Sequence, residues 1–136
     1  MTEVSLAAQR AAVVAMRGYQ DLTDIVPPLH IFDRNQRPEV FPCVIVGDAM
    51  VDSDDIDCAD TSEVSLDFHV WAVEDGLVCC KSIAGEMRRA LRRLSTELDG
   101  FKLNFMFGGA RYLRDPGGEH SHGVVTFIVR AWEPVT

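Results

Sequence analysis

The sequence lacks the common short motifs of catalysis and cofactor binding. It contains no G-x-S-x-G nucleophile motif, no G-x-x-x-x-G-K-[ST] phosphate loop, no G-x-G-x-x-G dinucleotide loop and no H-E-x-x-H zinc motif. It also lacks a run of about 18 apolar residues that could cross a membrane. Met1 is followed by TEVSL, which has neither the basic nor the apolar part of a secretory signal. These absences predict a protein that is not an enzyme, is made in the cytosol and has no membrane partner.

Cysteine is scarce and its spacing fits no metal site. The four cysteines are Cys43, Cys58, Cys79 and Cys80; no pair forms C-x-x-C, and no Cys/His spacing matches a zinc site. On a helix, the neighbouring Cys79 and Cys80 would point about 100° apart. We expect reduced cysteines that serve packing, with no metal and no cofactor.

Basic residues are fewer than acidic ones, and the two kinds are separated along the chain. The 13 Lys and Arg against 21 Asp and Glu give a net charge of −8, which argues against binding nucleic acid by neutralising phosphates. Residues 38–80 hold eleven acids and no Lys or Arg, whereas residues 81–114 hold eight bases and three acids. Either the two segments neutralise each other inside one fold, or the acidic face of one copy meets the basic face of another.

The length of 136 residues predicts a single domain over residues 1–136. Alternation and helical periodicity predict seven elements: helices at 3–19 and 76–100, and strands at 29–32, 43–51, 63–73, 102–114 and 123–132. The order α-β-β-β-α-β-β predicts an α+β domain. We expect an antiparallel sheet of four to five strands with two helices packed on one face.

Local signals place the ends and irregularities of these elements. Thr2 is the expected N-cap of the first helix, and Gly100 is expected to end the second. Gly47 and the Gly108-Gly109 pair are expected to bulge their strands. Residues 52–62 and the turn at 115–118 are expected to be exposed.

Two polar segments could hold an ion, and neither has the full ligand pattern. His120 and His122 would share one strand face, but a catalytic zinc needs about three protein ligands, and only Asp115 and Glu119 lie nearby. We interpret Asp115, Glu119, His120 and His122 as the tip of a hairpin. The segment DSDDIDCADTSE at 52–63 fails as a calcium loop, because Ile56 and Asp57 occupy its fifth and sixth positions. We interpret it as an acidic loop.

Four arginines concentrate positive charge on the second predicted helix. Arg88, Arg89, Arg92 and Arg93 would form two i,i+4 pairs on its exposed side, where like charges repel by a few tenths of a kcal/mol per pair. A negatively charged partner would explain this arrangement, and a solvated face is the alternative. On the strand at 63–73, Asp67, His69 and Trp71 lie on the polar face. They could form the pocket wall of a small ligand-binding or regulatory module.

The ordered features of the chain resemble a known family. They are an Ala-rich N-terminal helix and then the segments LHIFDR (29–34), FPCVIVGDA (41–49), SLDFHVWA (65–72), EMRRAL (86–91) and RYLRDPGGEHSHGVVTFIVRA (111–131). In this order they resemble the small tail-completion proteins of long-tailed phages and gene transfer agents, which are similar in role and fold to the lambda-type tail terminator.

The resemblance implies a structural subunit of a phage-like tail, assembled in the host cytoplasm. Its partners would be copies of itself in a hexameric ring, the tail tube protein and the head-tail connector or stopper protein. The ring would cap the head-proximal end of the tube, end its polymerisation and pass DNA through its lumen without sequence-specific binding. We expect Asp52, Asp54, Asp55 and Asp57 at the lumen or its rim. We expect the four arginines at the subunit interface, and the tip residues Asp115, Glu119, His120 and His122 facing tube or connector.

Overall fold

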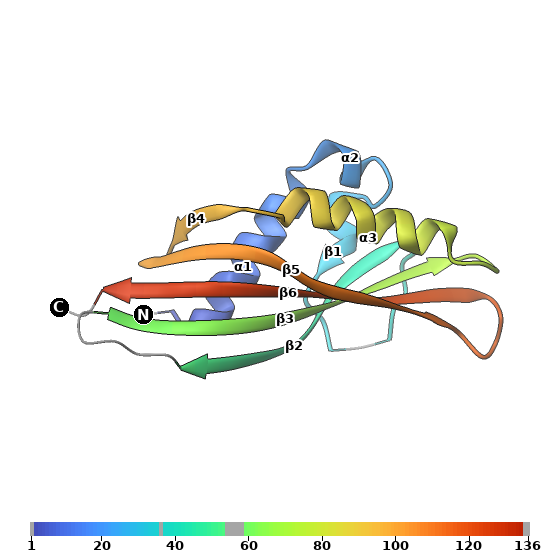
Figure 1. Ribbon diagram of the computed structural model, residues 1–136. Helices are drawn as coiled ribbons and strands as arrows, with labels where there is room; N and C mark the ends of the chain where they lie inside the picture. Colours follow the sequence, from blue (N-terminus) through green and yellow to red (C-terminus); the bar gives the residue numbers. More distant parts are fainter. Residues whose placement is uncertain (1, 36, 54–58, 135–136) are drawn as a thin grey trace.

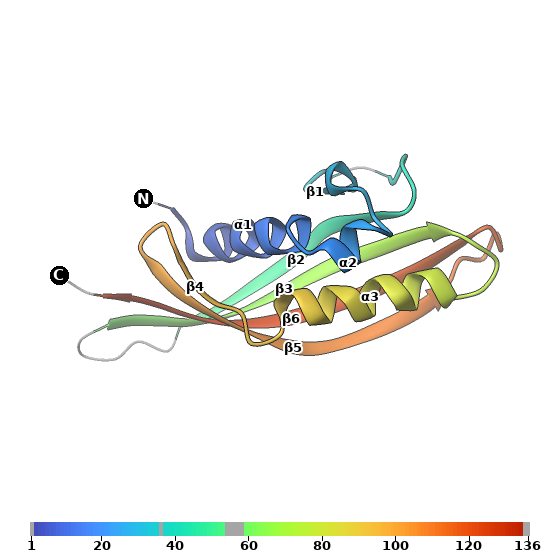
Figure 2. The same ribbon diagram turned by 90° about the horizontal axis from the view of Figure 1, so that it is seen from above.

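The computed structural model shows two long helices on one face of a twisted β-sheet (Figure 1). Seen from above, both helices lie over the same side of the strands (Figure 2). The structure describes residues 2–35, 37–53 and 59–134. The predicted α+β class is therefore confirmed, with the hydrophobic core between the helices and the sheet. No helix in the described part of the chain is long and apolar enough to cross a membrane.

The helices are α1 (Val4–Arg17), the short α2 (Gln20–Thr23), the 3-10 helix η1 (Pro28–His30) and α3 (Val78–Leu91). The alanines of α1 face the core: Ala7, Ala8 and Ala12 are completely buried. Their small side chains let the helix lie close to the strands. The predicted N-cap was wrong by one residue, because the Glu3 carboxylate accepts hydrogen bonds from the amides of Ser5 and Leu6.

The sheet has six strands: β1 (Ile31–Phe32), β2 (Cys43–Ser53), β3 (Ala59–Val73), β4 (Ser95–Leu98), β5 (Phe101–Arg114) and β6 (His120–Pro134). Their order across the sheet is β1-β2-β3-β6-β5-β4. β1 runs parallel to β2, and the other neighbours are antiparallel. The prediction of a purely antiparallel sheet of four to five strands was therefore wrong. The four-residue β4 is not among the predicted elements.

The second helix is shorter than predicted. It ends at Leu91, and Arg93 has a φ of 58°, which takes the chain out of the helical path. The residues that follow form β4, which pairs with β5. Just before β4, the Phe105 amide of β5 donates a hydrogen bond to the Leu94 carbonyl at 2.8 Å. Gly100, with a φ of 88°, belongs to the β4–β5 turn instead of ending the helix.

Strand boundaries also differ from the predicted ones, whereas the predicted irregularities are confirmed. β2 continues to Ser53 and β3 begins at Ala59, so the ends of the predicted loop at 52–62 are paired strand. β6 begins at His120, three residues earlier than predicted. The register shifts between Val46 and Ala49, and again between Phe107 and Gly109, at the glycines expected to bulge.

The core is built from the helix-facing side of the central strands. Val64, Leu66, Phe68 and Val70 of β3 are buried, as their alternation predicts. The Phe68 ring meets the Phe127 ring of β6 edge to face, with centroids 6.1 Å apart. The β3–β6 register decides which polar side chains meet on the opposite face.

Candidate functional site

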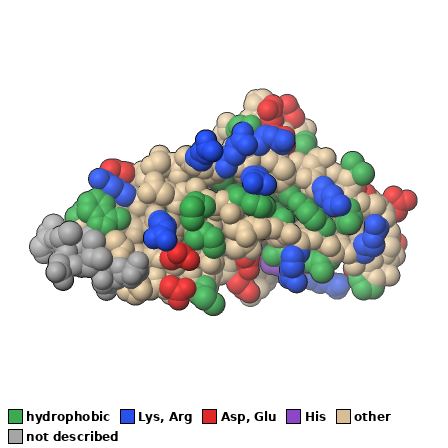
Figure 3. Space-filling view, viewed as in Figure 1, with side chains coloured by type: hydrophobic (Ala, Val, Ile, Leu, Met, Phe, Trp, Pro, Cys, Tyr) green, Lys and Arg blue, Asp and Glu red, His purple; other side chains and the backbone are tan. Residues whose placement is uncertain are grey.

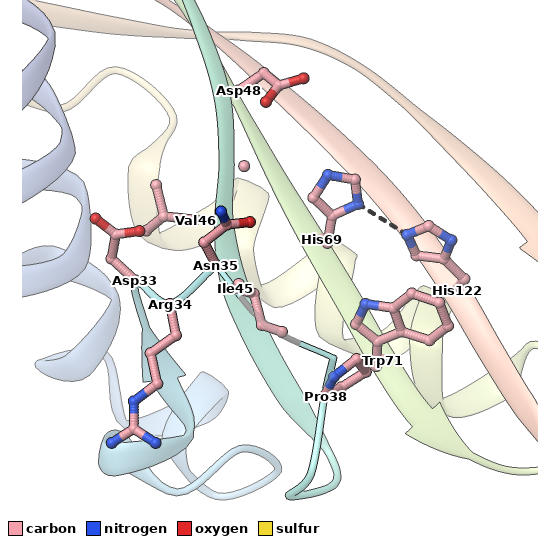
Figure 4. Close-up of a pocket in the computed structure, with 11 residues that line it drawn as sticks. Asp33, Arg34, Asn35, Pro38, Ile45, Val46, Asp48, His69, Trp71 and His122 are labelled. Atoms are coloured by element: carbon pink, nitrogen blue, oxygen red, sulfur yellow. Dashed lines mark hydrogen bonds between the residues drawn. The ribbon is translucent and has the colours of Figure 1, made fainter.

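A pocket opens on the sheet face that lies away from the helices. Residues 33–35 and Pro38, from the segment that connects β1 and β2, line one side of it. The cavity between them and the strands has a volume of about 520 Å³. Asp33 and Arg34 line the pocket on the segment side, while His69, Trp71 and His122 line it on the sheet side (Figure 4).

Two histidines and a tryptophan make the sheet side of this pocket. The β3–β6 register places Trp71 opposite His122, and the two rings stack with centroids 3.9 Å apart and planes 7° apart. His69 Nδ1 lies 2.8 Å from His122 Nε2. One imidazole must donate and the other accept, so at least one of the two rings is neutral.

Gly47 makes room for this cluster. A Cβ at this position would lie 2.7 Å from His69 Cδ2 and 2.9 Å from the Asp67 carbonyl. The absence of a side chain lets the His69 ring pack against the β2 backbone. The bulge at Gly47 therefore helps to place His69 as well as to bend the strand.

The surroundings of His122 favour its neutral form. Partial burial of the ring is the main cause of its lowered pKa, and the nearby His69 and Arg111 lower it further. Asp115 acts in the opposite direction and does not outweigh them. The His69–His122 hydrogen bond therefore sits in a setting that disfavours two protonated rings.

Asp67, which was expected on this polar face, does not belong to the pocket. Asp67 accepts a hydrogen bond from Thr126 Oγ1 at 2.7 Å and does not pair with His69. In the described part of the chain, no group of three or more His, Cys, Asp and Glu side chains could hold a metal ion. The structure brings His69 and Trp71 together as lining residues but leaves Asp67 out of the lining.

The four residues expected at the hairpin tip are divided between the turn and the sheet. Asp115 and Glu119 border the turn, and the Gly118 amide donates to the Asp115 carbonyl at 2.9 Å. His120 Nδ1 lies 3.4 Å from an Asp115 carboxylate oxygen, and its ring contacts the Phe41 ring at 4.8 Å. His122 lies within β6, so placing it on a protruding tip was wrong. Only the strand register could have revealed its partner His69.

Glu74 has a role that the sequence did not reveal. It accepts hydrogen bonds from the Cys79 and Cys80 amides, both at 2.9 Å, and from Ser121 Oγ at 2.6 Å. Burial acts to raise its pKa, but the bonds from Ser121 and the helix amides together lower it. Glu74 thus ties the N-terminus of α3 to the start of β6.

The four arginines do not share one helical face as expected. Arg88 and Arg89 lie in the last turn of α3, whereas Arg92 caps the helix and Arg93 follows it. The Arg88 guanidinium lies 4.3 Å from the centre of the Phe107 ring, and Arg89 pairs with Glu86 at 2.7 Å. All four side chains are exposed, so the end of α3 carries a basic surface.

The ion pairs of the described residues bear on whether the acidic and basic segments neutralise each other. Asp60 aside, no ion pair among the described residues joins an acid of 38–80 to a base of 81–114. The described residues of these segments take part in the ion pairs Arg10–Asp99, Arg89–Glu86, Lys102–Glu97 and Arg130–Glu63. Lys and Arg side chains gather over α3 and β5 on the face shown in Figure 3.

The cysteines and the acids of the predicted acidic loop are the last residues that the sequence singled out. Cys43, Cys79 and Cys80 are free, and burial raises the pKa of Cys43 and Cys80 to about 11, which fits the expected packing role. Asp52 is exposed on β2, opposite Glu63. Asp54, Asp55, Asp57 and the fourth cysteine, Cys58, lie outside the described residues.

Comparisons with known proteins find a family of similar sequence and two solved structures of similar fold. The model of the family described as Tail completion protein gp17 matches residues 10–131. A chain from the virion of a native gene transfer agent particle superposes with a TM-score of 0.85 at 18% identity, over 97% of this chain and 99% of that one. The bacteriophage SPP1 gp17 protein superposes with a TM-score of 0.57 at 23% identity, over 98% and 91%. No curated protein sequence matches the chain.

Proposed function

Because the chain belongs to the family of Tail completion protein gp17, we propose that it forms a ring that closes the head-facing end of a tail tube. The chain is a structural protein of the tail of a phage or gene-transfer-agent particle, and it is not an enzyme. Tail completion requires contacts with other tail and head proteins. We propose that these are the tail tube protein on one side and the connector or stopper protein on the other, and that six copies make the ring.

The observation that carries this proposal is the separation of charge within one subunit. A closed ring needs a heterologous interface, in which one face of a copy meets a different face of the next. The basic surface at the end of α3 and the acids of 38–80 supply two such faces. Among the described residues, and Asp60 aside, no ion pair joins the acidic segment to the basic one. Exposed charges such as Arg88, Asp48 and Asp52 could therefore attract those of a neighbouring copy.

We propose that Arg88, Arg89, Arg92 and Arg93 lie at this subunit interface. Arg89 already shares its charge with Glu86, so the other three carry most of the free positive charge. The stack of Arg88 on Phe107 holds its guanidinium at the surface beside β5. The turn residues Asp115 and Glu119, with His120 beside them, would then face the tube or the connector.

We further propose that the acids Asp52, Asp54, Asp55 and Asp57 contribute negative charge to the DNA path. Phosphates are repelled by acidic side chains, so a channel with this charge lets DNA pass without gripping it. Replacing Asp54, Asp55 and Asp57 with Ser, and keeping the strand residue Asp52, is expected to leave rings intact and slow DNA release from particles. Loss of rings in this variant would contradict the assignment.

The ring itself is tested by mass and by imaging. The purified chain is measured by mass photometry alone and with purified tail tubes, and the tube ends are viewed by negative-stain microscopy. We expect ring-shaped particles of a fixed size at one end of each tube, and tubes that stop growing once the chain is added. Tubes that lengthen at an unchanged rate, with no density at their ends, would overturn the proposal. The ligand-binding alternative predicts a monomer under all of these conditions.

A further inference from the structure

Both long edges of the sheet are left partly unpaired, at opposite ends. β1 pairs only with Val44 and Ile45 of β2, and within the described part of the chain no other strand borders the outer side of β2 at 47–53. β4 pairs only with residues 101–104 of β5, so the outer side of β5 at 106–114 also has no neighbouring strand among the described residues. Each open segment presents backbone N–H and C=O groups to the outside.

The open edge of β2 has few of the features that protect an edge strand. Its sequence, GDAMVDS, contains neither Lys nor Pro, and every side chain from Asp48 to Ser53 is exposed. Met50 keeps 63% of its surface and Val51 keeps 42%. An unpaired edge of this length, with two exposed apolar side chains at its centre, favours pairing with another strand.

The two open edges carry opposite charge. The β2 edge holds Asp48 and Asp52, both exposed and neither in an ion pair among the described residues. The β5 edge holds Arg111 and Arg114, which are likewise exposed and outside those ion pairs. If the β2 edge of one copy lay beside the β5 edge of another copy, acidic side chains would therefore lie near basic ones.

The strand directions are also compatible. β2, β3, β6 and β5 follow one another with antiparallel neighbours, so β2 and β5 run in opposite directions. In a ring whose axis lies along the strands, rotation preserves these directions. The β2 of one copy would then meet the β5 of the next as an antiparallel pair and continue the sheet.

The register shows how the copies would be offset. Met50 is level with Met106 through the pairs Met50–Ser65, Ser65–Ile128 and Ile128–Met106. Met50 is the centre of the open β2 segment, whereas the centre of the open β5 segment is Ala110, four residues further along. Neighbouring copies must therefore be staggered, and a stagger of this kind accompanies the strand tilt that closes a sheet into a barrel.

We propose that neighbouring copies join by pairing β2 at 47–53 with β5 at 106–114, so that the sheets of the ring become one continuous barrel. This inference rests on the proposed ring and specifies its interface. The basic end of α3 lies beside the same β5 edge, because Arg88 stacks on Phe107. The arginines of α3 would then flank the strand pairing and add to its attraction for the acidic edge.

Amide hydrogen exchange tests the backbone pairing directly. Wild-type chain is compared as a monomer and as rings assembled on tail tubes. We expect the amides at 47–53 and 106–114 to exchange more slowly in rings, while the amides of β6, which has neighbours on both sides, stay unchanged. Rings in which both segments exchange as fast as in the monomer would overturn the pairing and leave the ring itself intact. A chain that forms no ring even on tubes would overturn both.

Paired charge reversals test which edges meet. The variants Asp48→Arg/Asp52→Arg and Arg111→Glu/Arg114→Glu each give two edges of the same sign, so each is expected to lose ring assembly while keeping the wild-type circular dichroism. Mixing the two variants restores opposite charge at every junction and is expected to restore rings of alternating copies. The control Asp21→Arg/Asp24→Arg makes the same change of charge in α2 and at its C-cap, and it is expected to assemble. A mixture that stays monomeric, or single variants that assemble alone, would overturn the proposal.

Discussion

At the scale of single residues, His122 is expected to make the stability of the fold depend on pH. The pKa of His122 is lowered in the folded state, so the folded protein prefers the neutral ring. Such a group contributes stability that is fully present above its unfolded pKa, about 6.5, and is lost as the pH falls through the folded pKa. Thermal melts should show a lower Tm at pH 5 than at pH 7.5.

The variant His122→Asn isolates this contribution. It removes the titrating ring while keeping a polar side chain of similar length, so its fall in Tm over the same pH range should be smaller than that of the wild type. A His30→Asn variant serves as the control, because His30 lies outside this cluster and bonds the Pro42 carbonyl. An equal fall in the wild type and in His122→Asn would assign the pH dependence to other groups.

Gly47 provides a second residue-scale prediction. The variant Gly47→Ala places a Cβ within 2.9 Å of the His69 ring and of the Asp67 carbonyl. We expect it to lower the free energy of unfolding by about 1–3 kcal/mol, the usual cost of overpacking. Gly76→Ala is the matched control, because a Cβ there meets nothing within 4 Å. Urea denaturation compares the two, and equal stability would show that His69 moves aside without cost.

At the scale of elements, Glu74 connects α3 to β6. The variant Glu74→Ala leaves the Cys79 and Cys80 amides and the Ser121 hydroxyl without their acceptor. We expect a loss of roughly 1–2 kcal/mol, typical of a removed helix cap, measured by urea denaturation. Asp75→Ala tests whether the charge alone matters, because Asp75 is an exposed neighbour. A similar loss in both variants would argue against the capping role.

The elements also show what the sequence could predict and why the rest escaped prediction. The alternation from Val64 to Ala72 indicated β3, and its core face is the one observed. The helical stripe continued through Leu94 and Leu98, yet both side chains pack against the core from β4 and its approach. A stripe of leucines does not reveal a left-handed turn at Arg93, because tertiary context overrides local helix propensity.

The candidate site was harder to predict than the fold. Asp67, His69 and Trp71 were recognised on one strand face, since a period of two places them together. Their partner His122 lies 53 residues from His69, and only the β3–β6 register joins them. The Glu74 cap was missed for a similar reason: its acceptor role depends on how α3 starts and on the distant Ser121.

At the scale of the whole molecule, charge should govern assembly more than folding. Within the part of the chain that the structure describes, the basic end of α3 makes one direct ion pair, between Arg89 and Glu86. The charges of Arg88, Arg92 and Arg93 therefore add little to the stability of the monomer, as is usual for exposed groups. Their effect should appear where a neighbouring copy brings acids close to them.

The variant Arg89→Glu/Arg93→Glu measures that effect. Its rings should be weaker than wild-type rings, because two attractions across the interface become repulsions. Wild-type rings should also weaken as NaCl is raised from 50 mM to 500 mM, since salt shortens the range of these attractions. Sedimentation velocity at each salt concentration gives the fraction of chain in rings. Arg10→Glu is the control, because Arg10 pairs with Asp99 away from the end of α3. If the double variant assembles like the wild type at low salt, these arginines do not contact a neighbouring subunit.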